Sequence, residues 1–135
     1  MPATVYFDAS FLMLSAKFHA DVISDTETLL QGRVQFVVPA AVLAELKRLA
    51  NGLGAQGRDA RVALKLIQEK KIRSISSRGA SNADSALIQA SQLPKTIIAT
   101  ADQELRRKIR SAGKPVIFFR EKAKLELEGI DAAYW

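Results

Sequence analysis

The sequence predicts an α/β protein built as a three-layer α/β/α sandwich around a central parallel sheet. Short strand-like segments alternate with helical segments at least four times, which is typical of parallel strands joined by helices that cover both faces. Segments 34–38 and 95–100 are mostly apolar, as expected for strands buried on both faces. A chain of 135 residues can form one core but not two, so we expect a single domain over residues 1–135.

The first half of the chain contains signals for two strands and three helices. β-branched and aromatic residues alternate over 4–7, which predicts a strand that ends at an aspartate. A helix is expected over 10–17, and a second, short helix over 25–30 opens with acidic residues and stops at a glycine. The strand over 34–38 ends at a proline, which begins a helix over 40–50 whose apolar residues share one side.

A glycine-rich segment, 51–57, separates that helix from the next. It spells G-x-G-x-x-G, but it joins two helices, whereas the dinucleotide fingerprint joins a strand to a helix. We interpret it as a flexible loop, with substrate contact as an alternative role. Apolar spacing then predicts a helix over 58–70 and β-branched residues a short strand over 72–75.

Helical and strand-like segments alternate again in the last third of the chain. After a loop over 77–81, Ser81 or Asn82 is expected to cap a helix that runs to about Ser91. A buried strand over 95–100 follows.

The next predicted helix covers 102–112 and stops at Gly113, and the last predicted strand covers 116–119. We expect the tail to Trp135 to form a short helix. No repeat or linker divides the chain.

Charge and composition restrict the chemistry. The net charge of +6 favours a polyanionic partner. We expect nucleic acid and no membrane, since no apolar run approaches the roughly 20 residues of a spanning helix. The N-terminus enters a strand without a secretory signal, so a cytoplasmic location is expected. With no cysteine and one histidine, His19, catalysis must use carboxylates, hydroxyls, lysines or a bound metal.

Four acids are expected at one edge of the sheet: Asp8, Glu45, Asp84 and Asp102. Each follows a strand's carboxyl end or lies in the first two turns of the next helix, and open parallel sheets place their sites beyond those ends. Clustered carboxylates repel one another, and a divalent cation relieves the repulsion. Ligation by oxygen alone selects Mg²⁺ or Mn²⁺, which together with a basic surface indicates phosphodiester hydrolysis.

Each acid also has a purely structural interpretation. Asp8 could cap a turn and Asp102 could cap a helix. Asp84 could favour a helix dipole, and Glu45 could pair with a basic residue of its own helix.

Basic residues follow Asp102 closely and are candidates for phosphate contact. They are Arg106, Arg107, Lys108, Arg110 and Lys114. The alternative is a solvated helix face. Arg58, Arg61 and Lys65 form a second candidate stripe, and His19 is expected at the surface.

At these acids the chain resembles the PIN-domain family of small α/β nucleases, over nearly its whole length. Four motifs in order carry the resemblance: Asp8-Ala9-Ser10, Val37-Val38-Pro39 with Glu45-Leu46, Asn82-Ala83-Asp84-Ser85-Ala86-Leu87-Ile88, and Thr100-Ala101-Asp102 with Glu104-Leu105-Arg106. The segment from Leu105 to Ile117 is most similar to the stand-alone archaeal branch, which is related to PIN nucleases of small-subunit ribosomal RNA processing.

The resemblance implies an endoribonuclease that uses Mg²⁺ or Mn²⁺ held by the four acids, with Ser10 and Thr100 as supporting polar residues. Two positions depart from the family pattern: many members have threonine and asparagine where this chain has Ala9 and Ser10, and a second acid beside Asp84 is missing. The resemblance also implies self-association as a homodimer.

Three functions stay open. A ribonuclease that matures ribosomal RNA, with a ribosome-assembly partner, competes with a toxin ribonuclease silenced by an antitoxin. A catalytically weak RNA-binding assembly factor is the third, and it predicts RNA binding that survives Asp8→Asn and does not depend on metal.

Overall fold

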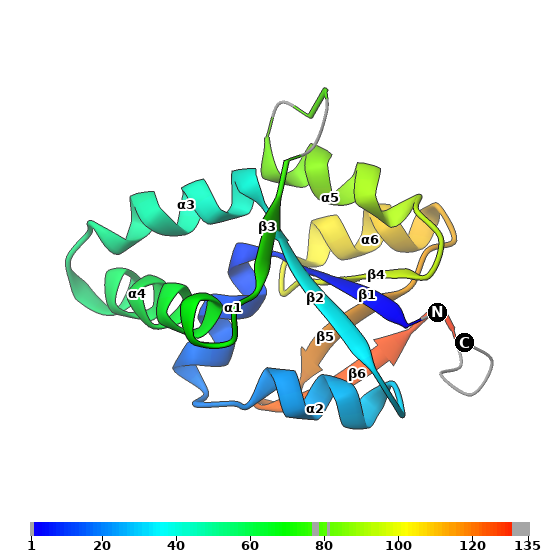
Figure 1. The fold of residues 1–135 in the computed structure, drawn as a ribbon, viewed down its shortest axis with the longest axis horizontal. Coiled ribbons are helices and arrows are strands. Elements are labelled where there is room, and N and C mark those ends of the chain that lie inside the picture. Colours follow the sequence, from blue (N-terminus) through cyan, green and yellow to red (C-terminus); the bar gives the residue numbers. More distant parts are fainter. Residues whose placement is uncertain (1, 77–78, 81, 131–135) are drawn as a thin grey trace.

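The computed structural model describes residues 2–76, 79–80 and 82–130, which contain six strands and six helices (Figure 1). The strands are β1 (Ala3–Phe7), β2 (Val34–Pro39), β3 (Arg73–Ile75), β4 (Thr96–Ala99), β5 (Val116–Arg120) and β6 (Lys124–Glu128). The helices are α1 (Ala9–Lys17), α2 (Val22–Leu29), α3 (Ala40–Ala50), α4 (Gly54–Glu69), α5 (Ala83–Ser91) and α6 (Gln103–Ser111). The predicted α/β class is confirmed.

The strands form one sheet in the order β3-β2-β1-β4-β5-β6. All neighbouring strands are parallel except β6, which runs antiparallel to β5. Chain order therefore runs outward from β1 in one direction through β2 and β3, and in the other through β4 and β5. The switch point lies between β1 and β4, where open α/β sheets form their sites at the carboxyl ends.

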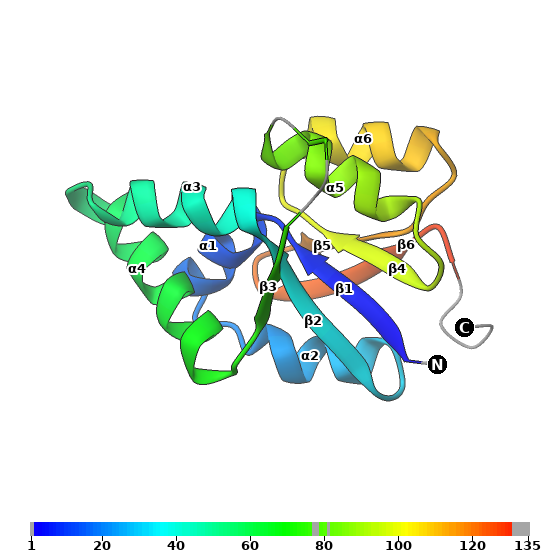
Figure 2. The ribbon, with the colours of Figure 1, turned by 45° about the horizontal axis from the view of Figure 1, so that its top comes forward.

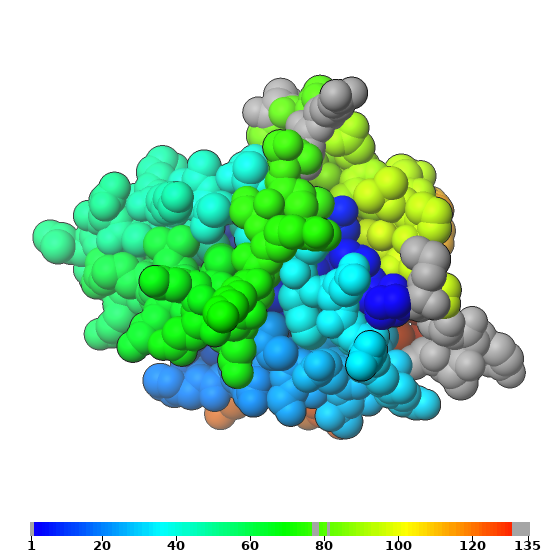
Figure 3. Space-filling view, in the orientation of Figure 1, coloured from blue at the N-terminus to red at the C-terminus, as the bar shows by residue number. Residues whose placement is uncertain are grey.

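The helices cover the sheet from both sides. Figures 1 and 2 show α5 and α6 on one side and α2 on the other. Helices α1, α3 and α4 pack against one another. Helices α3 and α4 extend beyond the sheet in Figure 1, and they form the left side of the surface in Figure 3. Stacked rings join β1 to β2 (Phe7 on Phe36), β1 to α1 (Phe7 on Phe11) and α1 to β5 (Phe11 on Phe119). No helix in the described part of the chain is long and apolar enough to span a bilayer.

The predicted helix in the tail is wrong, because residues 124–128 form β6. Leu125 and Leu127 alternate there with Glu126 and Glu128, and this period of two places the leucines on one face of a strand. The expectation for residues 131–135 lies outside the described residues.

The expected loop over 51–57 is shorter than predicted, because α4 begins at Gly54. The guanidinium of Arg61 donates to the carbonyl oxygens of Ala50 (2.9 Å) and Gly52 (3.2 Å), so a helical side chain closes the corner. Gly57 is buried against Gly52, and a Cβ at position 57 would overlap the Gly52 carbonyl. The glycine therefore permits two helices to turn in a very short space.

The predicted cap of α5 is confirmed in one of its two alternatives. The side chain of Asn82 accepts a hydrogen bond from the Ser85 N–H at 2.8 Å. Ser81, the other alternative, lies outside the described residues, as do residues 77 and 78 of the preceding loop.

Candidate active site at the sheet switch point

Asp8 and Thr100 lie side by side at the switch point. In the β1–β4 pairing Phe7 is opposite Ala99, so the residues that leave the two strands, Asp8 and Thr100, become neighbours. Both are buried, Asp8 at 6% exposure and Thr100 at 0%. The sheet register thus places a carboxylate and a hydroxyl in the interior at its carboxyl edge.

Three donors hold the Asp8 carboxylate. Its Oδ1 accepts the Ala9 N–H at 2.8 Å, which caps α1. Its Oδ2 accepts the hydroxyls of Ser10 at 2.8 Å and Thr100 at 2.6 Å. Ser10 Oγ in turn accepts the Ala101 N–H at 3.1 Å. The two residues predicted to support the site, Ser10 and Thr100, therefore orient Asp8 directly.

Glu45 and Asp84 approach Asp8 from helices on either side. Glu45 is half-buried in the second turn of α3, and Asp84 is exposed in the first turn of α5. The Asp84 charge raises the pKa of Asp8, and the charges of Asp8 and Asp84 both raise the pKa of Glu45. Three of the four predicted acids therefore share one electrostatic neighbourhood.

Burial is the largest influence on the two inner acids. It raises the pKa of the Asp8 carboxyl, and Asp84 adds to that rise, while the hydrogen bonds from Thr100, Ser10 and Ala9 oppose it. It also raises the pKa of Glu45, where Arg48 opposes the rise. Among the described residues no ion pair neutralises Asp8, Glu45 or Asp84.

Asp102 is placed differently. It is exposed and caps α6, its Oδ1 accepting the N–H groups of Glu104 (2.9 Å) and Leu105 (3.2 Å). Its own N–H donates to Thr100 Oγ1 at 3.0 Å. The structural alternative for Asp102, a helix cap, is thus present, and Thr100 joins this residue to Asp8.

The donor set suits a hard cation by its chemistry, since it consists of carboxylate and hydroxyl oxygens and carries uncompensated negative charge. The amino ends of α1 and α6 meet at the same place, and they favour negative charge there. Within residues 2–76, 79–80 and 82–130, however, no three acidic or histidine side chains converge into a ready ligand set. Asp8, Glu45 and Asp84 interact electrostatically without forming a preassembled ligand set.

The predicted phosphate-binding residues divide into two groups. Arg106 and Arg110 both pair with Glu128, at 3.0 and 3.3 Å, and Arg106 also lies 3.5 Å over the Phe118 ring. These contacts hold α6 against the β5–β6 hairpin. Arg107 is exposed, and no ion pair within the described residues engages it.

Two further positions complete the predicted basic set. Lys108 pairs with Glu104 on its own helix. Lys114 is half-buried, and its carbonyl accepts from Arg110 at 3.0 Å.

Sequence reasoning missed a surface depression beside the acids. It has a volume of about 470 Å³ and begins at Ser10, Ala101 and Glu45. From there it runs between α1, α3 and the first turns of α4. The only signal in the sequence was the glycine-rich corner, which sets where α4 starts.

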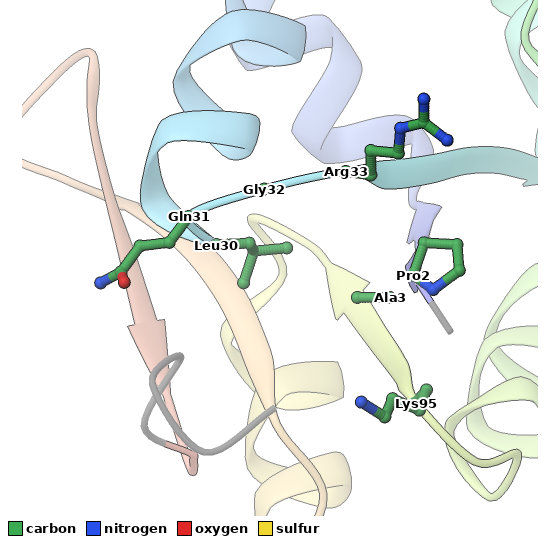
Figure 4. Close-up of a pocket in the computed structure, with 7 residues that line it drawn as sticks. All are labelled: Pro2, Ala3, Leu30, Gln31, Gly32, Arg33 and Lys95. Atoms are coloured by element: carbon green, nitrogen blue, oxygen red, sulfur yellow. The ribbon is translucent and has the colours of Figure 1, made fainter.

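Another depression, of about 310 Å³, lies at the opposite edge of the sheet (Figure 4). Its lining residues precede or begin strands: Pro2, Ala3, Leu30, Gln31, Gly32, Arg33 and Lys95. They include two cations and no acid, so this pocket offers no carboxylate for a metal ion.

Comparisons with known proteins agree with this architecture. Residues 5–122 match the model of a family described as a PIN like domain. The chain is 32% identical over 125 residues to ribonuclease VapC9 of Archaeoglobus fulgidus, covering 92% of this chain and 88% of that protein.

Two solved structures share the fold. The PIN domain endonuclease Utp24 superposes with a TM-score of 0.80 at 23% identity, covering 96% of this chain and 93% of that one. A domain of a functionally unknown Methanocaldococcus jannaschii protein superposes with a TM-score of 0.62 at 17% identity, covering 96% and 99%.

Proposed function

The chain belongs to the PIN-like domain family, and from that membership we propose that it is a metal-dependent endoribonuclease that hydrolyses RNA phosphodiester bonds. One observation carries the proposal: buried Asp8 shares its neighbourhood with Glu45 and Asp84 at the sheet switch point, with no cation of the described chain paired to them. The 32% identical relative is named a ribonuclease, which supports RNA as the substrate.

Asp8, Glu45 and Asp84 are the residues that would hold Mg²⁺ or Mn²⁺, with Asp102 as the fourth predicted ligand. When bound, such an ion activates water and neutralises charge that develops on the phosphate. Thr100 and Ser10 keep the Asp8 oxygens in one orientation, and outer hydrogen bonds of this kind commonly decide how well a carboxylate binds metal.

RNA would approach a surface that is basic as a whole. Arg107 is our candidate for phosphate contact, because it is exposed and no ion pair of the described residues engages it, whereas Arg106 and Arg110 are engaged by Glu128. Arg107 would position the substrate without reading its bases.

The direct test is cleavage of labelled single-stranded and structured RNA during a titration with Mg²⁺ or Mn²⁺. We expect the wild type to cleave with a metal-dependent rate and Asp8→Asn to lose cleavage while it remains folded. Asp25→Asn is the matched control, because Asp25 is exposed in the first turn of α2. Full activity of Asp8→Asn would refute the proposal, and RNA binding without cleavage in the wild type would favour the assembly-factor alternative.

The biological setting has two candidates, ribosomal RNA processing and a toxin ribonuclease with an antitoxin partner. Expression of the chain alone separates them. A toxin arrests growth unless its neighbouring gene is also expressed, and Asp8→Asn abolishes the arrest. A processing nuclease leaves growth unaffected.

A further inference from the structure

The depression beside the acids continues away from them as a groove, here called the α4 groove. It is lined beyond the site by Met13, Leu14, Lys17, Leu49, Gln56 and Asp59. The whole depression, of which the α4 groove is the outer part, has a volume of about 470 Å³, which lies within the range of small-molecule sites, roughly 300–1,000 Å³. Since Ser10, Ala101 and Glu45 line the same depression, a ligand in the groove would be continuous with one at the carboxylates.

The lining has two kinds of surface. Met13, Leu14 and Leu49 are half-buried and apolar, which suits the face of a base removed from its stack. Gln56 and Asp59 lie three residues apart on α4, so their side chains share one face of the helix. The groove therefore combines an apolar wall with a polar edge.

The polar groups of the groove have no protein partners in the described part of the chain. No ion pair or side-chain hydrogen bond there involves Lys17, Gln56 or Asp59. Lys17, in the last turn of α1, is a cation of the kind that contacts phosphate. An ionised Asp59 only accepts hydrogen bonds, and so it favours a base that carries an amino group.

The α4 wall of the groove is anchored at the α3–α4 corner. Arg61 closes the α3–α4 corner through the carbonyls of Ala50 and Gly52, and Gly57 is buried against Gly52. Gln56 and Asp59 flank Gly57 in the same first turns of α4. Because the helix that carries these side chains is already in place, ordering them around a ligand costs little conformational entropy.

We propose that the α4 groove is a nucleotide subsite beside the scissile phosphate, in which Gln56 and Asp59 read the edge of a base that carries an amino group and Lys17 contacts a phosphate. This inference rests on the proposed RNA cleavage. Adenine, cytosine and guanine satisfy the Asp59 carboxylate, whereas uracil presents carbonyl oxygens on both sides of its single N–H.

The test is cleavage of an RNA with a randomised segment, followed by sequencing of the products. We expect uracil to be depleted at one fixed position beside the cut, and Asp59→Asn to weaken that depletion on the order of tenfold, the usual effect of a specific base contact. The control is Glu69→Gln, because Glu69 lies on the exposed far end of the same helix and keeps the preference. Equal preferences in both variants, or none in the wild type, would overturn the subsite.

A second measurement is independent of catalysis. Binding of fluorescent oligoadenylate and oligouridylate is followed by anisotropy in EDTA, and wild type is compared with Lys17→Ala and with Lys70→Ala, a control at an exposed lysine on the far end of α4. We expect the wild type to bind oligoadenylate more tightly than oligouridylate. The number of counterions released on binding, read from the salt dependence of the affinity, should fall by about one in Lys17→Ala and stay unchanged in the control. If the protein cleaves no RNA but shows this pattern, the nuclease proposal fails, and the α4 groove stands as an RNA-binding groove without a scissile phosphate beside it. If it cleaves RNA while the two lysine variants bind alike, the groove fails.

Discussion

Thr100 joins two of the predicted acids through one hydroxyl group. Its Oγ1 donates to Asp8 Oδ2 at 2.6 Å and accepts the Asp102 N–H at 3.0 Å. The first contact favours the ionised carboxylate, and the second fixes the start of α6. A fully buried threonine directly after β4 therefore holds both the Asp8 carboxylate and the start of α6 in place.

We predict that Thr100→Val lowers RNA cleavage by about tenfold or more, the usual cost of removing an outer hydrogen bond. It should also lower the free energy of unfolding by about 1–3 kcal/mol, because the buried Asp8 carboxylate and the partly buried Asp102 N–H lose their partner. Cleavage assays and denaturant unfolding check both effects.

Thr96→Val is the matched control for this change. Thr96 is 4% exposed at the other end of β4, and its hydroxyl donates to the Pro94 carbonyl at 3.0 Å. It should lose stability and keep its cleavage rate. An equal loss of cleavage in both variants would mean that Thr100 contributes only to stability.

At the scale of elements, the α3–α4 corner depends on one close approach. A Cβ at position 57 would overlap the Gly52 carbonyl, although alanine would otherwise favour the helix by about 1 kcal/mol. We predict that Gly57→Ala destabilises the protein by about 1–3 kcal/mol, the typical cost of overpacking. Thermal unfolding measures this loss of stability. Gly32→Ala is the control, because a Cβ added at position 32 would have no atom within 4 Å. A Gly57→Ala variant more stable than wild type would contradict the prediction, because it would show that the α3–α4 corner can shift to accommodate a Cβ at little cost.

The β5–β6 hairpin is attached to α6 through Glu128. Hydrogen bonding to Arg106 lowers the pKa of Glu128 below its ordinary value of 4.5, and Arg110 acts in the same direction. A lowered carboxyl pKa stabilises the fold above the ordinary value, and this contribution disappears as the pH falls through the folded-state pKa. Because the pair is partly exposed, we expect it to contribute about 0.2–1 kcal/mol.

We therefore predict that Glu128→Gln is less stable than wild type at pH 7 and that the difference shrinks below pH ~4.5. Urea unfolding at several pH values at low salt checks this. The same difference at pH 3 and pH 7 would show that the ion pair does not stabilise the hairpin.

For the whole molecule, periodicity and turn residues were sufficient to predict the α/β class and most elements. The helix over 40–50 is correct to the residue, and the Asn82 cap is confirmed. β6 was missed because Leu125 and Leu127 form a two-residue pattern too short to distinguish from a helix, and only pairing with β5 selects the strand. The start of α4 was missed because Arg61 satisfies the corner's carbonyls from a distant position.

The four acids show how much of the candidate site could be predicted from the sequence. Strand order cannot be read from the sequence, yet the order decides that Asp8 and Thr100 become neighbours. The placement of Asp8, Glu45 and Asp84 near one another agrees with the expected edge of the sheet. Asp102 shows that the same position also serves as a helix cap, so residue type and spacing alone do not separate the two roles.

Direct measurement of Mn²⁺ binding by isothermal titration calorimetry tests whether the carboxylates share one ion. The wild type is compared with Asp8→Asn, Glu45→Gln and Asp84→Asn, and Asp25→Asn serves as the control. We predict that each of the three changes weakens Mn²⁺ binding by about tenfold or more, while the control binds as wild type. Undiminished Mn²⁺ affinity in all three variants would contradict a shared metal site.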